Sequence, residues 1–200
     1  MSTFVVSYAR TNGYEGEGTV NHWADRGGET YAGISRKFHP DWAGWRYLDL
    51  LAQDGRRPAL QEQHEIDLLH ADFFMRKFWI AAGCHHIDDQ DIADEMYDSA
   101  VNVGTGRAQE WLQVALNVCN RRGTLWPDLT VDGRVGPLTA KAAAQAVNDR
   151  LRKWLVLQMQ ETQQRHHYMN LAMADPTQEE NIFGWFRLRV QHSSPPPSTR

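Results

Sequence analysis

Residues 14–34 read Y-E-G-E-G-T-V-N-H-W-A-D-R-G-G-E-T-Y-A-G-I, a stretch rich in glycine and polar residues between two apolar-periodic parts of the chain. Its composition predicts an irregular segment that holds at most a short hairpin. Glu15 and Glu17 follow the end of a predicted first helix. A carboxyl group at such a junction can be half buried beside a cleft, which raises its pKa and suits it to protonating a leaving group. Taken alone, an isolated Glu-Gly pair is more often a solvated charge in a turn, so the interpretation depends on the rest of the chain.

Outside this stretch, the spacing of apolar residues predicts helices almost throughout. An amphipathic first helix begins near Phe4 and ends near Gly13. A turn-rich connection then leads into a short helix, and Pro58 opens a longer one. The apolar stripe predicted for that longer helix consists of Leu60, His64, Ile66, Leu69, Phe73, Phe74 and Phe78. Further helices are predicted over 92–103, 107–118, 137–148 and 149–173, with a last short one near 182–190. Strand-like alternation is almost absent, so we predict a mainly α fold.

Composition restricts the class of function. The formal net charge is −4, which argues against a nucleic-acid partner because such proteins usually carry a basic face. No apolar run approaches the roughly 18 residues of a membrane span, so we expect no membrane insertion. The first residues lack the basic and apolar regions of a signal peptide. We therefore expect synthesis as a soluble cytoplasmic chain that is carried elsewhere if it acts elsewhere.

The cysteines and histidines do not indicate a cofactor. Two cysteines, Cys84 and Cys119, cannot define a disulfide framework, and the sequence leaves open whether they pair. Cys84 stands beside His85 and His86, but the spacing is not that of a metal site. We expect no metal and no cofactor. The chain has eight tryptophans, among them Trp42 and Trp45, and these are compatible either with stacking on sugars or with ordinary core packing.

Two motifs in order point to one family. The first is E-G-x-G-x-x-N-x-x-x-D-x-G-G-E-T-x-x-G-I over 15–34, followed by S-R-K-F-H-P-D-W-x-G-W. The second is D-S-A-V-N-x-G over 98–104, then W-L-Q over 111–113 and D-G-x-x-G-P-x-T over 132–139. Together with a closing F-G-W-F-R-L-R-V, these resemble glycoside hydrolase family 108, the lysozyme-like N-acetylmuramidases, with its C-terminal predicted peptidoglycan-binding region. The resemblance covers about residues 4 to 191 and implies a lysozyme-like helical fold with a short irregular or β-hairpin active-site loop.

The chain departs from the family pattern at the acid itself. The family opens with E-G-G-Y-x-N, with five positions from glutamate to asparagine. Here Glu15 lies six positions before Asn21 and Glu17 lies four. The phase of the preceding helix favours Glu15 as the catalytic acid, with Glu17 as the alternative; weakened catalysis is a third outcome.

The resemblance also implies roles for the neighbouring residues. Hydrolysis between N-acetylmuramic acid and N-acetylglucosamine needs a proton donor and a second carboxylate. Asp25 is the favoured second carboxylate, and Glu29 is a weaker candidate that reads equally well as a capping residue. Thr30 and Tyr31 either line the cleft or pack and cap, and Asn21 either contacts substrate or holds the loop through backbone bonds.

The implied organisation is a catalytic region over 1–95, a peptidoglycan-binding-like region over 96–191 packed with it into one body, and a flexible tail over 192–200. The implied function is a peptidoglycan muramidase. Alternatives are a lytic transglycosylase, a wall-degrading effector with an immunity protein, and a non-catalytic wall-binding protein. The expected substrate is the peptidoglycan glycan strand, reached in the periplasm or on the cell wall through holin-dependent release or a secretion machinery.

Overall fold

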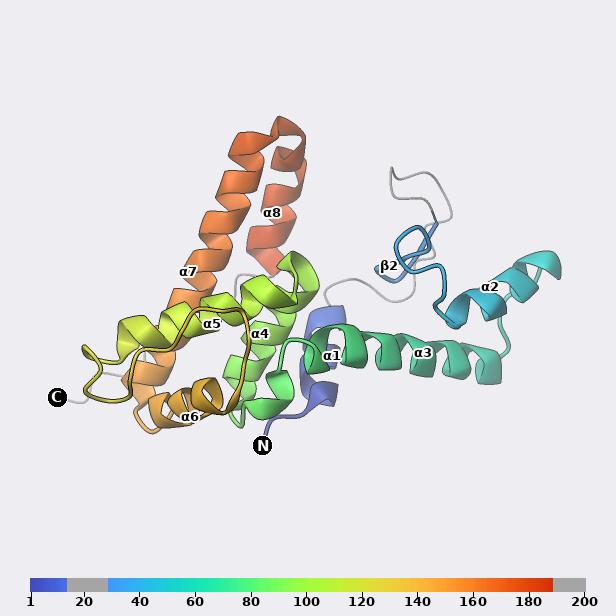
Figure 1. The fold of residues 1–200 in the computed structure, drawn as a ribbon. Helices are drawn as coiled ribbons and strands as arrows, with labels where there is room; N and C mark the ends of the chain where they lie inside the picture. The colour runs from blue at the N-terminus through green and yellow to red at the C-terminus, as the bar shows by residue number, and fades with distance from the viewer. Residues whose placement is uncertain (14–28, 189–200) are drawn as a thin grey trace. The chain divides into compact units, whose positions relative to one another are not determined.

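The computed structural model describes residues 1–13 and 29–188, and within those residues it is built from helices and one small sheet (Figure 1). The sheet is an antiparallel hairpin of β1 (Thr30–Tyr31) and β2 (Ile34–Ser35). The prediction of a mainly α, lysozyme-like fold with a short hairpin is confirmed.

The hairpin turn explains one of the predicted glycine positions. Ala32 and Gly33 connect the two strands, and their φ angles are 41° and 84°. A two-residue hairpin of the I′ type needs positive φ at both central residues, and glycine adopts that conformation without steric cost. Gly33 therefore permits the tight connection that turns the chain back on itself directly after the glycine-rich segment.

The chain forms two compact units. The smaller unit is Tyr8–Lys77, and the larger unit consists of Met1–Ser7 and Phe78–Arg200. The division falls within helix α1 (Phe4–Gly13) and within the π-helix η1 (Met75–Ile80). The functional boundary expected between residues 95 and 96 is a different kind of division and stays a prediction.

The smaller unit contains the hairpin, α2 (Gly44–Gln53) and α3 (Leu60–Phe74). Near the start of α3, the Glu62 carboxylate accepts a hydrogen bond of 2.9 Å from the backbone N–H of Ala59, a favourable position for an anion at a helix N-terminus. The predicted stripe of α3 is partly wrong. Leu60 is 89% exposed and His64 is exposed, whereas the buried residues of this helix are Ile66, His70 and Phe74.

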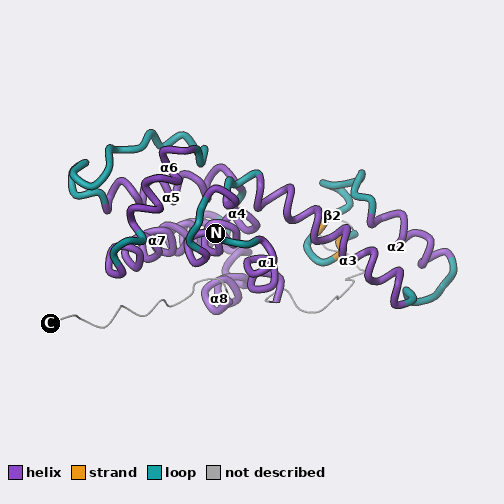
Figure 2. The backbone as a smooth tube through the Cα atoms, turned by 90° about the horizontal axis from the view of Figure 1, so that it is seen from below, coloured by secondary structure: helices purple, strands orange, loops and turns teal. Residues whose placement is uncertain are grey.

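The larger unit is a helical assembly. Its helices after η1 are the short 3-10 helix η2 (Cys84–His86), α4 (Gln90–Val103), α5 (Thr105–Cys119), α6 (Pro137–Ala146), α7 (Arg150–Ala174), the short η3 (Pro176–Gln178) and α8 (Glu179–Leu188). Helices α4, α5 and α7 pack against one another, and α8 lies alongside α7 (Figures 1 and 2). The large side chains that are buried on α4, α5 and α7 include Met96, Tyr97, Leu112, Leu116, Val156 and Tyr168.

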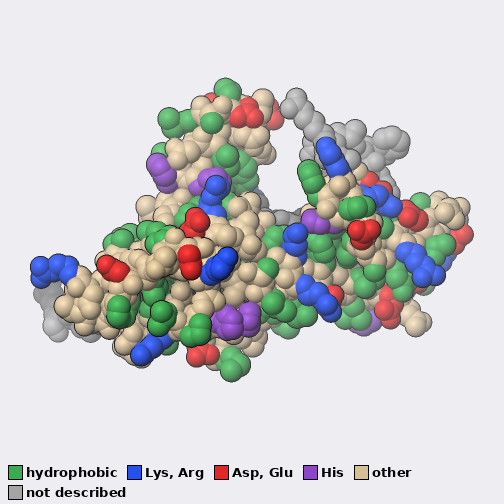
Figure 3. Space-filling model, viewed as in Figure 1, with side chains coloured by type: hydrophobic (Ala, Val, Ile, Leu, Met, Phe, Trp, Pro, Cys, Tyr) green, Lys and Arg blue, Asp and Glu red, His purple; other side chains and the backbone are tan. Residues whose placement is uncertain are grey.

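Local signals set the helix ends of the larger unit. Asp149 accepts a hydrogen bond of 2.7 Å from the N–H of Arg152 and so caps α7, which confirms the predicted break before that helix. Pro137 occupies the first position of α6, where its missing N–H costs nothing. Gly104, with φ of 93°, ends α4. Side chains of both charges are interspersed over the visible face of the described residues (Figure 3).

Candidate functional site

The predicted site residues divide into two groups. Glu15, Glu17, Asn21 and Asp25 lie outside the described residues, so their roles stay predictions. The other three residues are Glu29, Thr30 and Tyr31. They lie at the start of the hairpin, directly after residues 14–28. The structure therefore gives the framework that borders the predicted catalytic segment on both sides.

One buried histidine holds both borders of this framework. His70, on α3, is 7% exposed. Its Nδ1 lies 2.6 Å from the hydroxyl of Tyr8 on α1, and its Nε2 lies 2.9 Å from the carbonyl oxygen of Ala32 in the hairpin. A carbonyl oxygen only accepts, so Nε2 carries the proton and the Tyr8 hydroxyl donates to Nδ1. The helix before the glycine-rich segment and the hairpin after it are thus attached to one imidazole.

Aromatic packing surrounds this histidine. Tyr31 is buried, stacks on Trp42 with ring centroids 5.6 Å apart, and meets the His70 ring edge-on at 6.2 Å. The Tyr31 hydroxyl accepts a hydrogen bond of 3.2 Å from the side-chain amide of Gln63. These contacts give Tyr31 a packing role, and its contact with substrate stays a prediction.

An arginine joins the hairpin to α2 through two carboxylates. The guanidinium of Arg36 lies 2.6 Å from a carboxylate oxygen of Glu29 and makes two hydrogen bonds, of 2.7 and 3.1 Å, to the carboxylate of Asp49. The hydrogen bond to Asp49 is the largest cause that raises the pKa of Arg36, and the Glu29 carboxylate raises it further. Arg36 in turn lowers the pKa of Asp49. Glu29 is therefore engaged in an ion pair. Its role as second carboxylate stays a prediction.

The W-A-G-W part of the first motif has a steric explanation. Trp42 folds back over the start of α2, and a Cβ atom placed on Gly44 would lie 2.2 Å from the Trp42 ring. Only glycine leaves room there, since the indole is held by a hydrogen bond of 3.2 Å from its Nε1 to the carbonyl oxygen of Leu69. The motif thus encodes the position of one tryptophan.

The second motif is explained by a buried glutamine in the larger unit. Gln113 on α5 is 1% exposed, and its side-chain oxygen accepts hydrogen bonds of 3.0 Å from the N–H groups of both Asp132 and Gly133. Its amide nitrogen donates to the Asp132 carboxylate at 2.8 Å and to the Arg134 carbonyl at 2.9 Å. The W-L-Q and D-G-R parts of the motif are therefore joined by the hydrogen bonds of Gln113. Gly133 adopts the left-handed conformation at a φ of 66°, which glycine permits.

A cluster of buried polar side chains lies between α4 and α7 of the larger unit. Glu95 is 8% exposed, and burial followed by the charges of Asp98 and Glu161 raises its pKa well above the ordinary value. The Glu161 carboxylate pairs with Arg165 at 2.7 Å. From the first part of the second motif, Asn102 donates a hydrogen bond of 2.7 Å to the Tyr168 hydroxyl, so this motif too links α4 to α7.

Sequence reasoning missed His70 and the Arg36–Asp49 pair. A histidine within an apolar stripe carries no signal of its own, and its partners are 62 and 38 residues away. Among the described residues no three His, Cys, Asp or Glu side chains are placed to hold a metal ion, and Cys84 and Cys119 are both free. No described helix is long and apolar enough to cross a membrane.

Comparison with protein families identifies the class. Residues 8–104 match the family described as glycosyl hydrolase 108, and residues 107–190 match the family described as predicted peptidoglycan domain. The chain belongs to the glycosyl hydrolase 108 family and carries that peptidoglycan domain after the hydrolase region, as the two motifs predicted. It is thus a glycoside hydrolase whose substrate is peptidoglycan.

A search of solved structures found similarity to SagA of Brucella abortus. That similarity covers 94% of this chain and 96% of the other, at 17% sequence identity and a TM-score of 0.49. A comparison with curated proteins found no match.

Proposed function

We propose that the protein is an N-acetylmuramidase that hydrolyses the β-1,4 bond between N-acetylmuramic acid and N-acetylglucosamine. The observation that carries this proposal is the family match over 8–104, because it spans the segment that holds Glu15 and Asp25. The peptidoglycan domain over 107–190 supports the same substrate.

In this proposal Glu15 protonates the leaving oxygen and Asp25 is the second carboxylate, with Glu17 as the alternative acid. In the sequence, Glu15 follows the last residue of α1 by two positions, and Asp25 precedes the first residue of β1 by five. The Tyr8–His70–Ala32 connection supports the assignment, since it holds the elements on both sides of these carboxylates to α3.

The test is mass spectrometry of digested peptidoglycan with the wild type and the variants Glu15→Gln, Glu17→Gln and Asp25→Asn. We expect reducing N-acetylmuramic acid ends from the wild type and a large loss of rate for Glu15→Gln. Anhydro-muramic ends would replace the hydrolase by a lytic transglycosylase, because that product forms by internal attack of the substrate's own hydroxyl. Loss of activity in Glu17→Gln alone would transfer the role of acid to Glu17. Wild-type rates in both glutamate variants would remove Glu15 and Glu17 from the mechanism, and a wild-type rate in Asp25→Asn would remove Asp25.

The roles of the two regions and the place where the protein acts are also part of the proposal. We propose that residues 1–95 supply catalysis and residues 96–191 contact the wall, with action in the periplasm or on the cell wall after export. Release through a holin pore and delivery by a secretion machinery remain the two routes. An inhibitor that co-purifies with the chain and blocks hydrolysis would favour delivery as an effector with an immunity protein.

A further inference from the structure

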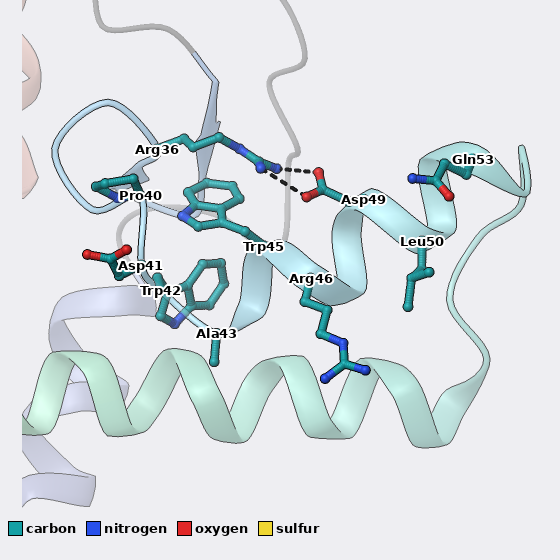
Figure 4. Close-up of a pocket in the computed structure, with 10 residues that line it drawn as sticks. All are labelled: Arg36, Pro40, Asp41, Trp42, Ala43, Trp45, Arg46, Asp49, Leu50 and Gln53. Atoms are coloured by element: carbon teal, nitrogen blue, oxygen red, sulfur yellow. Dashed lines mark hydrogen bonds and ion pairs between the residues drawn. The ribbon is translucent and has the colours of Figure 1, made fainter.

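A surface pocket of about 490 Å³ lies in the smaller unit, between the loop after the hairpin and α2 (Figure 4). Six of the side chains that line it carry the inference, namely Arg36, Asp41, Trp42, Trp45, Arg46 and Asp49. All of them belong to the S-R-K-F-H-P-D-W-A-G-W segment or to the helix that follows it. We call this the Arg46 pocket.

The aromatic wall of the Arg46 pocket is rigid. The Trp42 and Trp45 rings meet nearly at right angles, 89°, with centroids 5.0 Å apart. The Nε1 of Trp45 donates a hydrogen bond of 2.7 Å to the carbonyl oxygen of His39, and the Arg36 guanidinium lies 4.4 Å from the Trp45 ring centre. Such a wall changes little on binding, so the entropy lost in ordering it on contact with a ligand is small.

The tryptophan faces are not available to a sugar. Trp42 is 9% exposed and Trp45 is 3% exposed, and the guanidinium of Arg36 covers one face of Trp45. Stacking on a pyranose ring would need an open aromatic face. The ligand of this pocket is therefore recognised mainly through its charged groups, with the aromatic wall as support.

Some charged side chains of the pocket are bonded to one another, and others have no bonding partner among the described residues. Arg36 is bonded to Asp49 and paired with Glu29, so these groups satisfy one another. Arg46 and Asp41 are exposed and have no ion pair or hydrogen bond with any other described residue. In Figure 4 dashed lines join only Arg36 and Asp49, and the Asp41 carboxylate and the Arg46 guanidinium stand apart from that pair. The pocket thus offers one free anion and one free cation.

We propose that the Arg46 pocket binds the peptide stem of peptidoglycan through a zwitterionic residue of that stem. This inference rests on the proposed function, because it assigns part of the same substrate to a second place on the smaller unit. Stem peptides carry free carboxylates, and an uncrosslinked diamino acid adds a free ammonium group. Arg46 takes a carboxylate, and Asp41 takes the ammonium group. A purely anionic ligand is disfavoured, since it would also meet the carboxylates of Asp41 and Asp49.

The experiment compares two substrates and four variants. The substrates are intact peptidoglycan and glycan strands whose peptides an amidase has removed. The pocket variants are Arg46→Gln and Asp41→Asn, and the matched controls are Arg57→Gln and Glu65→Gln, which change exposed charges of the same unit outside the pocket. We expect each pocket variant to raise KM for intact peptidoglycan about twofold to fivefold, the range of an exposed charge contact, with kcat unchanged. On stripped strands the pocket variants and the controls should match the wild type.

A binding measurement makes the test independent of catalysis. Calorimetric titration with a free stem tetrapeptide that contains a diamino acid should show binding to the wild type and to both controls, and binding to Arg46→Gln that is weaker by a similar factor. Acetylating the side-chain amine of the tetrapeptide should weaken binding to the wild type to the level of Asp41→Asn. Equal use of intact and stripped strands with no tetrapeptide binding would overturn the pocket assignment and leave the hydrolase proposal intact. If the wild type cleaves neither substrate, the proposed function fails, and the titration still decides the pocket.

Discussion

Replacing Tyr8 by phenylalanine tests whether His70 holds the borders of the predicted catalytic segment. The variant keeps the ring, which meets Phe74 at 6.1 Å and the His70 ring at 5.9 Å, and removes only the hydroxyl that donates to Nδ1 at 2.6 Å. Nδ1 then becomes a buried acceptor without that donor, because His70 is 7% exposed. Removing the donor to a buried acceptor costs about 1–3 kcal/mol. For a chain of this length, each 1 kcal/mol lowers the melting temperature by roughly 2–4 °C.

The assay is urea denaturation followed by circular dichroism, with hydrolysis of peptidoglycan measured on the same preparations. Tyr47→Phe is the control, since the Tyr47 hydroxyl makes no hydrogen bond with other described residues. We expect Tyr8→Phe to lower the free energy of unfolding by the amount above and to slow hydrolysis at temperatures where it is still folded. Tyr47→Phe should leave both quantities unchanged. Equal stability and equal activity in the two variants would refute the reasoning about His70.

Three further variants test the packing described above. Gly44→Ala places a methyl group against the Trp42 ring, and we expect it to destabilise the chain by about 1–3 kcal/mol in denaturant titration, whereas unchanged stability would mean that the indole moves freely. Asp149→Ala removes the N-cap of α7 and should lower the free energy of unfolding by about 0.5–2 kcal/mol. Asp149→Asn is the control, because asparagine also caps a helix through its side-chain oxygen. Glu95→Gln should flatten the pH dependence of stability. Because burial raises the pKa of Glu95 in the folded chain, its contribution is present at low pH and is lost as pH rises above about 4.3, the ordinary value for Glu. Thermal melts at pH 5 and pH 8 should therefore show the variant gaining relative to the wild type at pH 8, and parallel curves would contradict this.

Helix positions could be predicted from the sequence because their signals are local. The end of α1 at Gly13, the start of α6 at Pro137 and the break before α7 at Asp149 each depend on residues within one turn of the helix end. The phase of α3 could not be predicted well. Leu60 and His64 continue its apolar pattern by sequence but are exposed, whereas the hairpin residue Tyr31 packs against His70.

The motif proposes Glu15, with Glu17 as the alternative, and Asp25 as the carboxylates of the site, and these roles stay predictions. The side chains that support the hairpin and helix beside them could not be predicted. The contact of His70 with Tyr8 and Ala32, and that of Arg36 with Asp49, join residues that are 13 to 62 positions apart. A single sequence holds no information on such pairs, because any polar residue at these positions fits the same local pattern.

The attachment of both borders to His70 bears on the irregular glutamate spacing. The family pattern has five positions between glutamate and asparagine, and this chain has six from Glu15 or four from Glu17. For a flexible loop of about twenty residues whose ends are held by a partner outside it, adding one residue changes the free energy of loop closure by only about 0.04 kcal/mol. The flanking helix and hairpin are then unaffected by the change in length. The contacts that His70 makes with Tyr8 and Ala32 therefore do not depend on how many residues separate Glu15 or Glu17 from Asn21.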